Sequence, residues 1–143
     1  MTGTVVEIGL FGSVIDTPDN VRTMIGNNKI FSDTIQNCSS ADYRRVDRTA
    51  QLAHSVNVQD AVKRLKEALP KISNVRPVPP PDVEITDFNA RGPVLAVRAY
   101  AHTDHYWQVY FDINRTISET FGEAGYPVPE EHMHMRQAVA AQR

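Results

Sequence analysis

The feature that most constrains this fold is a long amphipathic pattern in the last third of the chain. Apolar residues recur there at the spacing of one helical face over about 21 residues. Thr103 or Asp104 can cap the start of such a helix, and Gly125 and Pro127 stop it. A helix with one apolar stripe must cover another element, so we expect it to pack on a sheet. The stripe consists of Tyr106, Val109, Tyr110, Ile113, Ile117 and Phe121.

The segments before this helix supply the sheet and a second helix. Residues 46–53 have the pattern of a strand, and Asn57 then resembles an N-cap, with Asp60 three residues later as in a capping box. Helical spacing follows and ends at Pro70. Residues 83–101 alternate on both sides of a turn, which is typical of a β-hairpin. The order β-α-β-β-α predicts a ferredoxin-like α+β layer with both helices on one face of a small sheet.

The first forty residues have a different pattern, that of short strands. Residues 4–8, 10–15 and 21–25 are rich in β-branched side chains. A Thr-Pro-Asp-Asn turn at 17–20 separates the second strand from the third, and a Gly-Asn-Asn turn at 26–28 follows the third. We therefore expect a small β unit without a long helix.

Charge and apolar content exclude several classes of protein. The chain has 143 residues, a net charge of −2 and a pI near 6.2, which gives no electrostatic argument for nucleic acid. Arg44, Arg45 and Arg48 alternate with acidic residues, so we interpret this cluster as a solvated strand edge. The longest apolar run is 94–97, whereas a membrane span needs about 20 such residues. No signal peptide is visible at the start of the sequence.

Candidate chemical groups are few, and we predict neither an enzyme nor a bound cofactor. His102, Asp104 and His105 could ligate a metal, but polar residues at a helix start explain them better. Cys38 has no partner for a disulfide and no neighbouring histidine. No phosphate-binding glycine loop, nucleophile-elbow serine or HExxH helix is present.

An aromatic cluster offers one further alternative. Tyr106, Trp107, Tyr110 and Phe111 could form a platform on which bases stack. Because Tyr106 and Tyr110 lie in the apolar stripe, core packing is the better interpretation. The rival function is therefore a binding module, in which the β unit takes RNA or the α/β part takes a small ligand.

Motifs in the first half of the chain carry a family pattern. Residues 3–11 resemble the GxVexIxlf start of the middle β domain of small-conductance mechanosensitive (MscS-type) channels. Residues 16–20 resemble the turn after the next strand of that domain. Residues 26–30 stand where the family has Pro-Asn-Gly/Ser-x-Ile, and residues 35–37 match its IxN close.

The second half continues the same pattern. Arg44 and Arg45 resemble the start of the family's α/β domain, residues 103–107 its TxDYW helix start, and residues 121–125 its FdeaGI helix end. The resemblance covers about residues 3–135, and the order and spacing of the motifs are more specific than any single one. It implies structural roles for Gly3, Asn27, Asn37, Asp104, Trp107 and Gly125.

The sequence departs from the family pattern in three places. Gly26 replaces the usual proline, and residues 130–132 are Glu-Glu-His where the family has an aromatic residue, proline and glutamine. The chain begins just upstream of the second strand of the family's β domain. We therefore expect the pore helices and the preceding strand to lie outside this sequence, which would make it a fragment or an unusually short homologue.

The resemblance implies a fold, a location and partners. Residues 1–42 would form an Sm-like β domain, residues 43–128 the α/β vestibule domain, and residues 129–143 a terminal barrel strand. The chain would assemble as a homoheptamer at the cytoplasmic side of the bacterial inner membrane, held there by the absent helices. Its vestibule would filter ions and small solutes released on hypo-osmotic shock, with no nucleic acid involved.

The terminal segment fits this scheme by its own pattern. His132, Met133, His134 and Met135 alternate polar with apolar, as one strand of a barrel would. A lone chain cannot pair such a strand, whereas neighbouring copies can. Since the two histidines would share one face, we also hypothesise that their protonation near pH 6 loosens the barrel.

Overall fold

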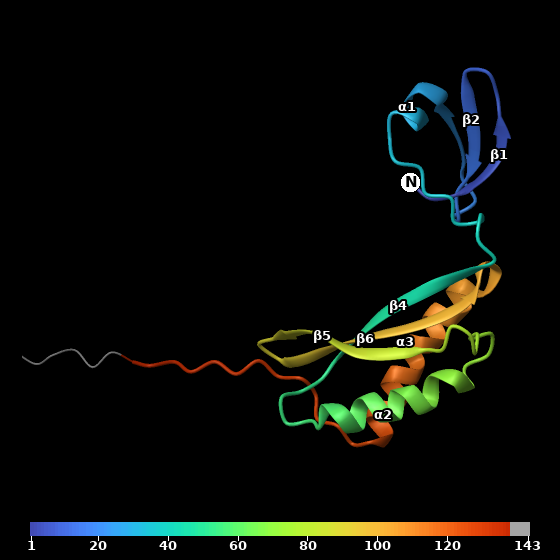
Figure 1. The fold of residues 1–143 in the computed structure, drawn as a ribbon. Coiled ribbons are helices and arrows are strands. Elements are labelled where there is room, and N and C mark those ends of the chain that lie inside the picture. Colours follow the sequence, from blue (N-terminus) through green and yellow to red (C-terminus); the bar gives the residue numbers. More distant parts are fainter. Residues whose placement is uncertain (138–143) are drawn as a thin grey trace, which may run out of the picture. The chain divides into compact units, whose positions relative to one another are not determined.

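The computed structural model describes residues 1–137 and has an α+β fold (Figure 1). It divides into two compact units, Met1–Cys38 and a second that begins at Ser39. The predicted limits of the domains, at 42/43 and 128/129, stay predictions. None of the helices in residues 1–137 has the length and apolar character needed to cross a membrane.

The first unit is a three-stranded antiparallel sheet with one short helix. The sheet order is β1-β2-β3 (Thr4–Ile8, Gly12–Asp16 and Arg22–Gly26). The five-residue helix α1 (Asn27–Phe31) follows β3 directly. The three predicted strands and the absence of a long helix from this unit are confirmed.

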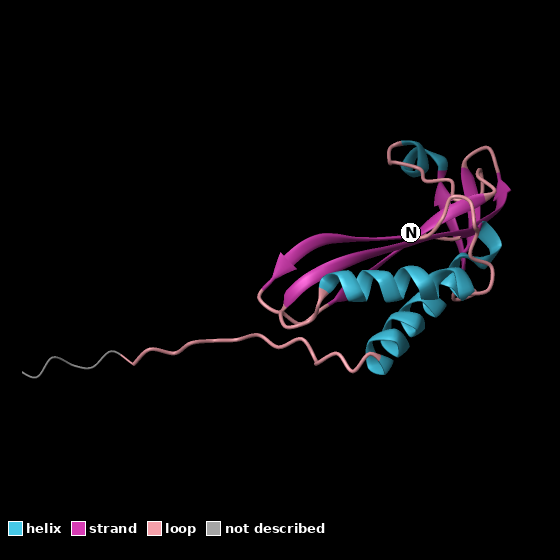
Figure 2. Ribbon diagram, turned by 60° about the horizontal axis from the view of Figure 1, so that its bottom comes forward, coloured by secondary structure: helices cyan, strands magenta, loops and turns pink. Residues whose placement is uncertain are grey.

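The second unit follows the predicted order β-α-β-β-α, and Figure 2 shows its two long helices lying on one face of the sheet. The sheet order is β4-β6-β5, with both pairs antiparallel. Two 3₁₀ turns precede or follow the main helices. The elements are β4 (Tyr43–Gln51), α2 (Val58–Ala68), η1 (Leu69–Lys71), β5 (Asp82–Asn89), β6 (Gly92–His102), η2 (Thr103–His105) and α3 (Tyr106–Glu123).

One hydrophobic core holds these elements together. Val109 and Ile113 of α3 and Leu65 of α2 are completely buried against the sheet. From the sheet, Val46 and Ala50 of β4 face the helices, as do Val83, Leu95, Val97, Ala99 and Ala101 of β5 and β6. The helical stripe and the strand alternation predicted from the sequence therefore meet in a single layer.

Two predicted helix starts need correction in detail. Asn57 caps α2 as expected, because its side chain accepts hydrogen bonds from the amides of Gln59 and Asp60 at 3.0 and 3.3 Å. The Asp60 carboxylate does not complete a capping box, since it bonds Arg64 instead. The start before α3 is capped by His102, whose Nδ1 accepts from the Asp104 amide at 3.2 Å, and not by Thr103 or Asp104.

Phe121 also differs from its expected place. The sequence pattern puts it in the apolar stripe, and full burial would make its truncation cost about 3–5 kcal/mol. The ring is only partly buried, packed against the core beside Tyr126 at a centroid distance of 5.4 Å. The completely buried anchors of α3 are Val109 and Ile113.

The segment after α3 contains neither helix nor strand over residues 126–137. Met133 and Met135 are 84% and 95% exposed. The predicted terminal strand needs partners that a single chain does not supply, and it stays a prediction. Of its predicted range, residues 138–143 lie outside the part that the structure describes.

Candidate functional site

The first unit exposes most of its large apolar side chains. Its only residue classed as buried is Ser13, and every residue of β1 is exposed. A 38-residue unit is below the size at which a chain normally buries a core of its own. Its exposed large apolar residues are Met1, Val5, Val6, Ile8, Leu10, Phe11, Val21, Met24, Phe31 and Ile35. Such a surface marks an interface.

Asn27 organises the tip of this unit. Its side-chain amide donates to the carbonyls of Gly9 and Leu10 at 2.8 and 3.1 Å, and its Oδ1 accepts from the Ser13 hydroxyl at 2.9 Å. Its backbone amide also bonds the Phe11 carbonyl at 3.0 Å. One side chain therefore fixes the β1–β2 turn against the start of α1.

Replacing Asn27 by alanine is expected to loosen this turn. The substitution removes three side-chain hydrogen bonds, each worth about 1 kcal/mol in net stability. Hydrogen exchange at the amides of β1 and β2 is the measurement, and it should speed up while exchange in β6 stays unchanged. Asn28→Ala is the control, because that neighbouring side chain is exposed. Equal exchange rates in the two variants would contradict the role given to Asn27.

Gly3 and Asn37 lie at the two ends of the first unit. A Cβ at Gly3 would lie 2.5 Å from Ile15 Cγ2 and 2.7 Å from the Asp16 carbonyl oxygen, so no larger residue fits beside β2. Asn37 lies on the exposed segment that leads out of the unit. The tight fit at Gly3 suits a structural role there, and the role of Asn37 stays a prediction.

Two arginines of β4 face the helix α3, which the sequence pattern did not reveal. The guanidinium of Arg44 lies over the Tyr106 ring at 3.9 Å, and that of Arg48 over the Tyr110 ring at 4.3 Å. Arg48 also donates to Asn114 Oδ1 at 2.8 Å. We predicted a solvated edge; only Arg45 of the three lies fully on the surface. Arginine stacks on aromatic faces, so these side chains join β4 to α3.

The aromatic residues of α3 divide into two sets. Tyr106 and Tyr110 are partly buried against the core, as predicted. Trp107 and Phe111 are 60% and 58% exposed, with their rings stacked at 6.2 Å. The four rings therefore form no continuous platform in the core, and the exposed pair remains available for contact.

Gly125 ends α3 in a left-handed conformation with φ of 66°. The Gly125 amide bonds the Gly122 carbonyl, and the Tyr126 amide bonds the Phe121 carbonyl, both at 3.1 Å. This pattern is a Schellman motif, for which glycine is the favoured residue. The hydroxyl of Tyr126 then donates to the Asp60 carboxylate on α2, which fixes where the chain leaves the unit.

The hydrogen bond from Tyr126 to Asp60 leads to a prediction about how stability depends on pH. The Tyr126 hydroxyl, followed by Arg64 with its Nε at 2.8 Å, holds the pKa of Asp60 below its usual value. A lowered folded pKa adds stability above the unfolded pKa, and that stability is lost as the pH falls through the folded value. Tyr126→Phe is expected to raise the pKa of Asp60 and to shrink this acid-side loss. A carboxyl-carbon NMR titration measures it.

Asp16 is the internal control for that titration. Arg22 lowers its pKa through a hydrogen bond of 2.9 Å in the first unit, which Tyr126 does not touch. The Asp16 titration should therefore be the same in both proteins. An unchanged Asp60 titration in Tyr126→Phe would show that the arginine alone sets its pKa.

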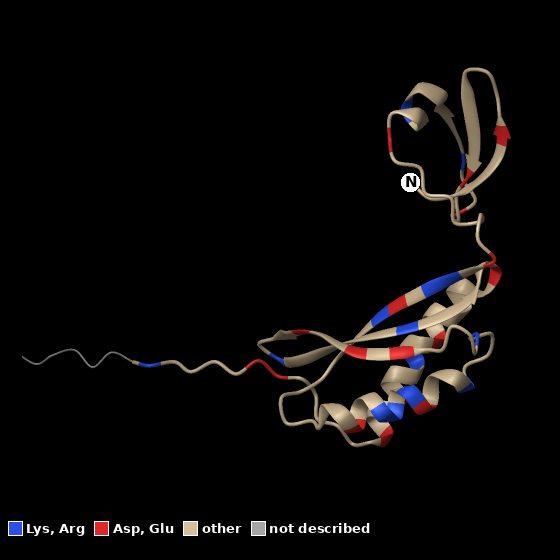
Figure 3. Cartoon of the chain, viewed as in Figure 1, with Lys and Arg blue, Asp and Glu red and all other residues tan. Residues whose placement is uncertain are grey.

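The sheet face away from the helices carries charged residues that pair with one another, and Figure 3 marks the charged positions of both signs along β4. Asp47 Oδ1 lies 2.9 Å from Arg45 Nε and 3.5 Å from Arg98 Nε. At the other edge, Lys66 of α2 reaches Glu84 of β5 at 3.5 Å. Exposed ion pairs of this kind contribute little to the free energy of folding. Their charged groups make this face of the sheet polar and hydrated.

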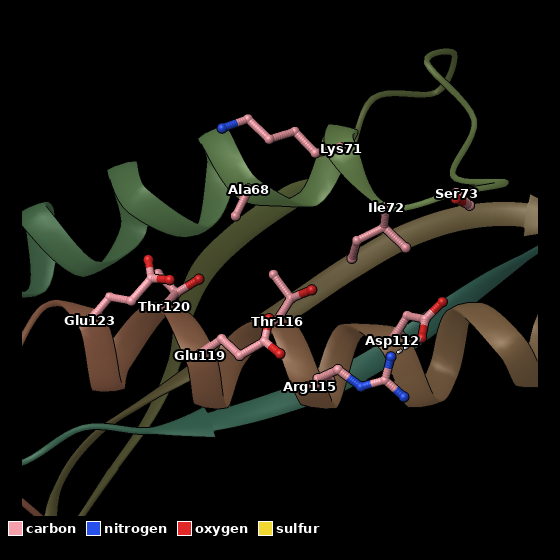
Figure 4. A pocket seen from close by; sticks show the side chains of 10 residues that line it. All are labelled: Ala68, Lys71, Ile72, Ser73, Asp112, Arg115, Thr116, Glu119, Thr120 and Glu123. Atoms are coloured by element: carbon pink, nitrogen blue, oxygen red, sulfur yellow. Dashed lines mark ion pairs between the residues drawn. The ribbon is translucent and has the colours of Figure 1, made fainter.

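A groove of about 360 Å³ runs between α3 and the end of α2 (Figure 4). Arg115 and Asp112 pair across one turn of α3 at 3.4 Å, while Lys71 and Glu119 lie on opposite walls. No buried side-chain polar atom in residues 1–137 lacks a hydrogen-bond partner. The groove is open and mixed in charge, and no set of its groups converges on a ligand.

The residues considered as possible metal ligands do not come together in a cluster within residues 1–137. Within residues 1–137, no group of three or more histidine, cysteine, aspartate or glutamate side chains could hold an ion. His102 and Asp104 lie at the helix start, 3.4 Å apart, and Asp104 is otherwise exposed. His132 and His134 lie on the exit segment, which contains no helix or strand, and Cys38 is exposed as the last residue of the first unit.

Comparison with known proteins follows the same division of the chain. Residues 1–40 match the family described as the mechanosensitive ion channel β-domain. Residues 46–128 match the family described as mechanosensitive ion channel MscS, C-terminal. The second match alone covers more than half of the chain.

Individual relatives agree with these matches. The small-conductance mechanosensitive channel of Edwardsiella ictaluri is 28% identical over 99% of this chain and 50% of that protein. The small-conductance mechanosensitive channel MscMJ of Methanocaldococcus jannaschii is 30% identical over 86% of this chain and 36% of that protein. The chain therefore spans half or less of the length of these curated relatives.

Solved structures share the fold. The closed state of Helicobacter pylori MscS matches with a TM-score of 0.84 at 17% identity, over 98% of this chain and 55% of that one. Arabidopsis thaliana MSL1 matches with a TM-score of 0.65 at 15% identity, over 86% and 47%. The chain belongs to the MscS family of mechanosensitive ion channels, of which it carries the β-domain and the C-terminal domain as two consecutive units.

Proposed function

We propose that this chain is the part of an MscS-type channel that lies outside the membrane and assembles with copies of itself around a water-filled vestibule. The observation that carries the proposal is the surface of the first unit, where Ser13 alone is buried. A small sheet with apolar residues on an open face gains stability when other chains cover it. In this proposal the copies supply that cover.

The proposal extends to the membrane and to the solutes. The complete protein would sit in the bacterial inner membrane with this region facing the cytoplasm, and would release ions and small solutes on hypo-osmotic shock. This region would hold the subunits together as a homoheptamer and filter what reaches the pore. It would have no catalytic role. The charged sheet face that includes Asp47 and Arg98 suits a wall in contact with water.

The terminal segment would close the assembly. Residues 132–135 of each subunit would form part of one strand, and the strands of all subunits together would form a barrel. His132 and His134 would then form stacked rings of like groups, and their protonation near pH 6 would weaken the barrel. A barrel with the same stability at about pH 5.5 and pH 8 would contradict the histidine hypothesis while leaving the assembly proposal intact.

A chimera tests the proposed function directly. The matched half of the Edwardsiella ictaluri channel would be replaced by this chain, keeping the membrane part of that relative, and produced in bacteria that lack their own channels. Survival of a sudden drop in osmolarity is the expected result. Native mass spectrometry of the purified chimera gives the number of subunits.

A matched variant controls for mere expression. Val6→Asp places a charge on a strand of the first unit whose side chain is 50% exposed in the single chain. If the unit is covered by neighbours, this charge is desolvated in the ring, so assembly and survival should both be lost. A chimera that assembles and protects equally well with and without Val6→Asp would refute the covered surface.

A further inference from the structure

The sheet of the second unit has one long open edge. β4 is nine residues long and pairs only with β6, because the sheet order is β4-β6-β5. No strand of the described residues lies on the other side of β4. An unpaired edge of this length presents a row of free backbone donors and acceptors, which natural proteins usually cover or protect.

The helix α3 overhangs this edge with exposed aromatic rings. Tyr106 and Tyr110 lie over the arginines of β4. Trp107 and Phe111 come one position later in the helix, so they are rotated toward the flank that faces away from α2. The opposite flank, with Asp112 and Glu119, lines the groove against α2. The exposed pair therefore projects beyond β4, over the place that a further strand would occupy.

The exit segment begins close to one end of this edge. A pocket of about 210 Å³ is lined by Gln51, the last residue of β4, by Leu52 after it, by Phe121 from α3, and by Val128 and Pro129 from the exit segment. Val128 therefore lies at the carboxy-terminal end of β4. Eight described residues follow Pro129, all without helix or strand, which is nearly the length of β4.

We propose that residues 130–136 dock along β4 of their own chain as an antiparallel fourth strand of this sheet. The proposed register places Val128 opposite Gln51, a residue with which it shares a pocket. Met133 then lies opposite Val46, and Met135 lies opposite Arg44. Pro129 falls directly before this edge strand, where a missing backbone donor is tolerated.

The side chains of the segment fit the two faces in this register. Val46 and Arg44 point to the helix side of the sheet, so both methionines are directed under Trp107 and Phe111. Thioether sulfur makes favourable contacts with aromatic rings. Glu131 falls opposite Arg48 on the same side, which pairs a carboxylate with a guanidinium.

The opposite face is equally consistent. His132 falls opposite Asp47 and His134 opposite Arg45, on the hydrated face that already carries the paired charges. A shift by one residue would bury both histidines and expose both methionines. The two alternations therefore exclude registers shifted by an odd number of residues, and the neighbourhood of Val128 and Gln51 favours this one among the rest.

This docking goes beyond the proposed channel assembly and does not depend on it. A segment paired with β4 cannot pair at the same time with the same segment of other copies. Docking would protect the edge and the methionines in a chain that has not assembled. Release of the segment would then accompany formation of any barrel.

Disulfide trapping tests the docking and its register in the whole chain. Cys38 is first replaced by serine, and Arg45→Cys is combined with His134→Cys. Directly opposite residues of antiparallel strands have Cα atoms about 4.5–5.5 Å apart, within the reach of a disulfide. The control is Thr49→Cys with His134→Cys, on the same face but four residues out of register, a separation of about 13 Å along the strand.

The expected result is an intramolecular disulfide in the matched pair, formed at least about tenfold faster than in the control because only opposite residues meet. The rate should not change on dilution. Absence of this intramolecular product would overturn the proposal whatever the oligomeric state. A disulfide that forms chiefly between two chains would assign the edge to a second copy and would also overturn it.

Fluorescence supplies a second readout, because Trp107 is the single tryptophan. Replacing both Met133 and Met135 by aspartate is expected to shift its emission to longer wavelength, since the docked segment no longer shields the indole from water. Replacing both His132 and His134 by asparagine is the control on the other face, because it adds no charge opposite Asp47, and it should leave the emission unchanged. Identical spectra for the two double variants would count against docking.

Discussion

Gly92→Ala is expected to destabilise the second unit by about 3–5 kcal/mol. Gly92 begins β6 with φ of 136°, a conformation that side chains rarely adopt. A Cβ there would lie 2.3 Å from the Leu52 carbonyl oxygen and 2.9 Å from the Ala53 carbonyl carbon. Because these are backbone atoms, they cannot rotate away, and the strand and the β4–α2 connection must both shift.

Gly122→Ala is the matched control for that substitution. Gly122 lies inside α3, and nothing approaches within 4 Å of a Cβ built on it. Since alanine is the better helix former, stability should rise by about 0.5–1 kcal/mol. Urea unfolding followed by far-UV circular dichroism measures both variants, because both long helices belong to the second unit. Equal midpoints would refute the close approach at Gly92.

Ile113→Ala is the second large effect. Ile113 is completely buried where α3 crosses the sheet. Its truncation removes apolar contacts and leaves a cavity, at a cost of about 2–5 kcal/mol. The same urea experiment applies, and the midpoint should fall without a change in slope. Phe121→Ala is expected to cost less, since that ring is only partly buried.

Glu119→Ala controls for position on the helix. Glu119 is an exposed residue of the same helix, and its replacement should change stability by no more than about 0.5 kcal/mol. If Ile113→Ala and Glu119→Ala were equally mild, α3 would not be anchored where the core places it.

The elements with the strongest periodicity could be predicted from the sequence. The stripe of α3 buries one face as its pattern predicts, and the 83–101 hairpin forms as predicted. Its alternation is followed less closely, because β6 is buried on both faces and Ile85 of β5 is 41% exposed. Asn57 was also predictable, because its side chain satisfies amides of its own helix. The order of elements followed from these local signals, and the family matches agree with the resemblance carried by the motifs.

The remaining features depend on residues far apart in the sequence. The local sequence pattern does not indicate that Arg44 and Arg48 stack on tyrosines. Their partners lie sixty-two residues further along the chain, as in the Arg48–Tyr110 hydrogen bond. The role of His102 as a cap was hidden by the threonine and aspartate beside it, which are the more usual caps. The exposure of Trp107 likewise follows only from the lateral position of α3 on the sheet.

The bare apolar surface of the first unit has a consequence for how the two units respond to concentration. The second unit encloses its own core, so its unfolding free energy belongs to one molecule. In the proposed assembly the first unit owes its cover to other copies, so its stability would obey mass action. Diluting the protein would then unfold strands β1 to β3 at a concentration where β4 to β6 remain folded. The folded fraction of the amino-terminal unit would therefore depend on the concentration of the chain.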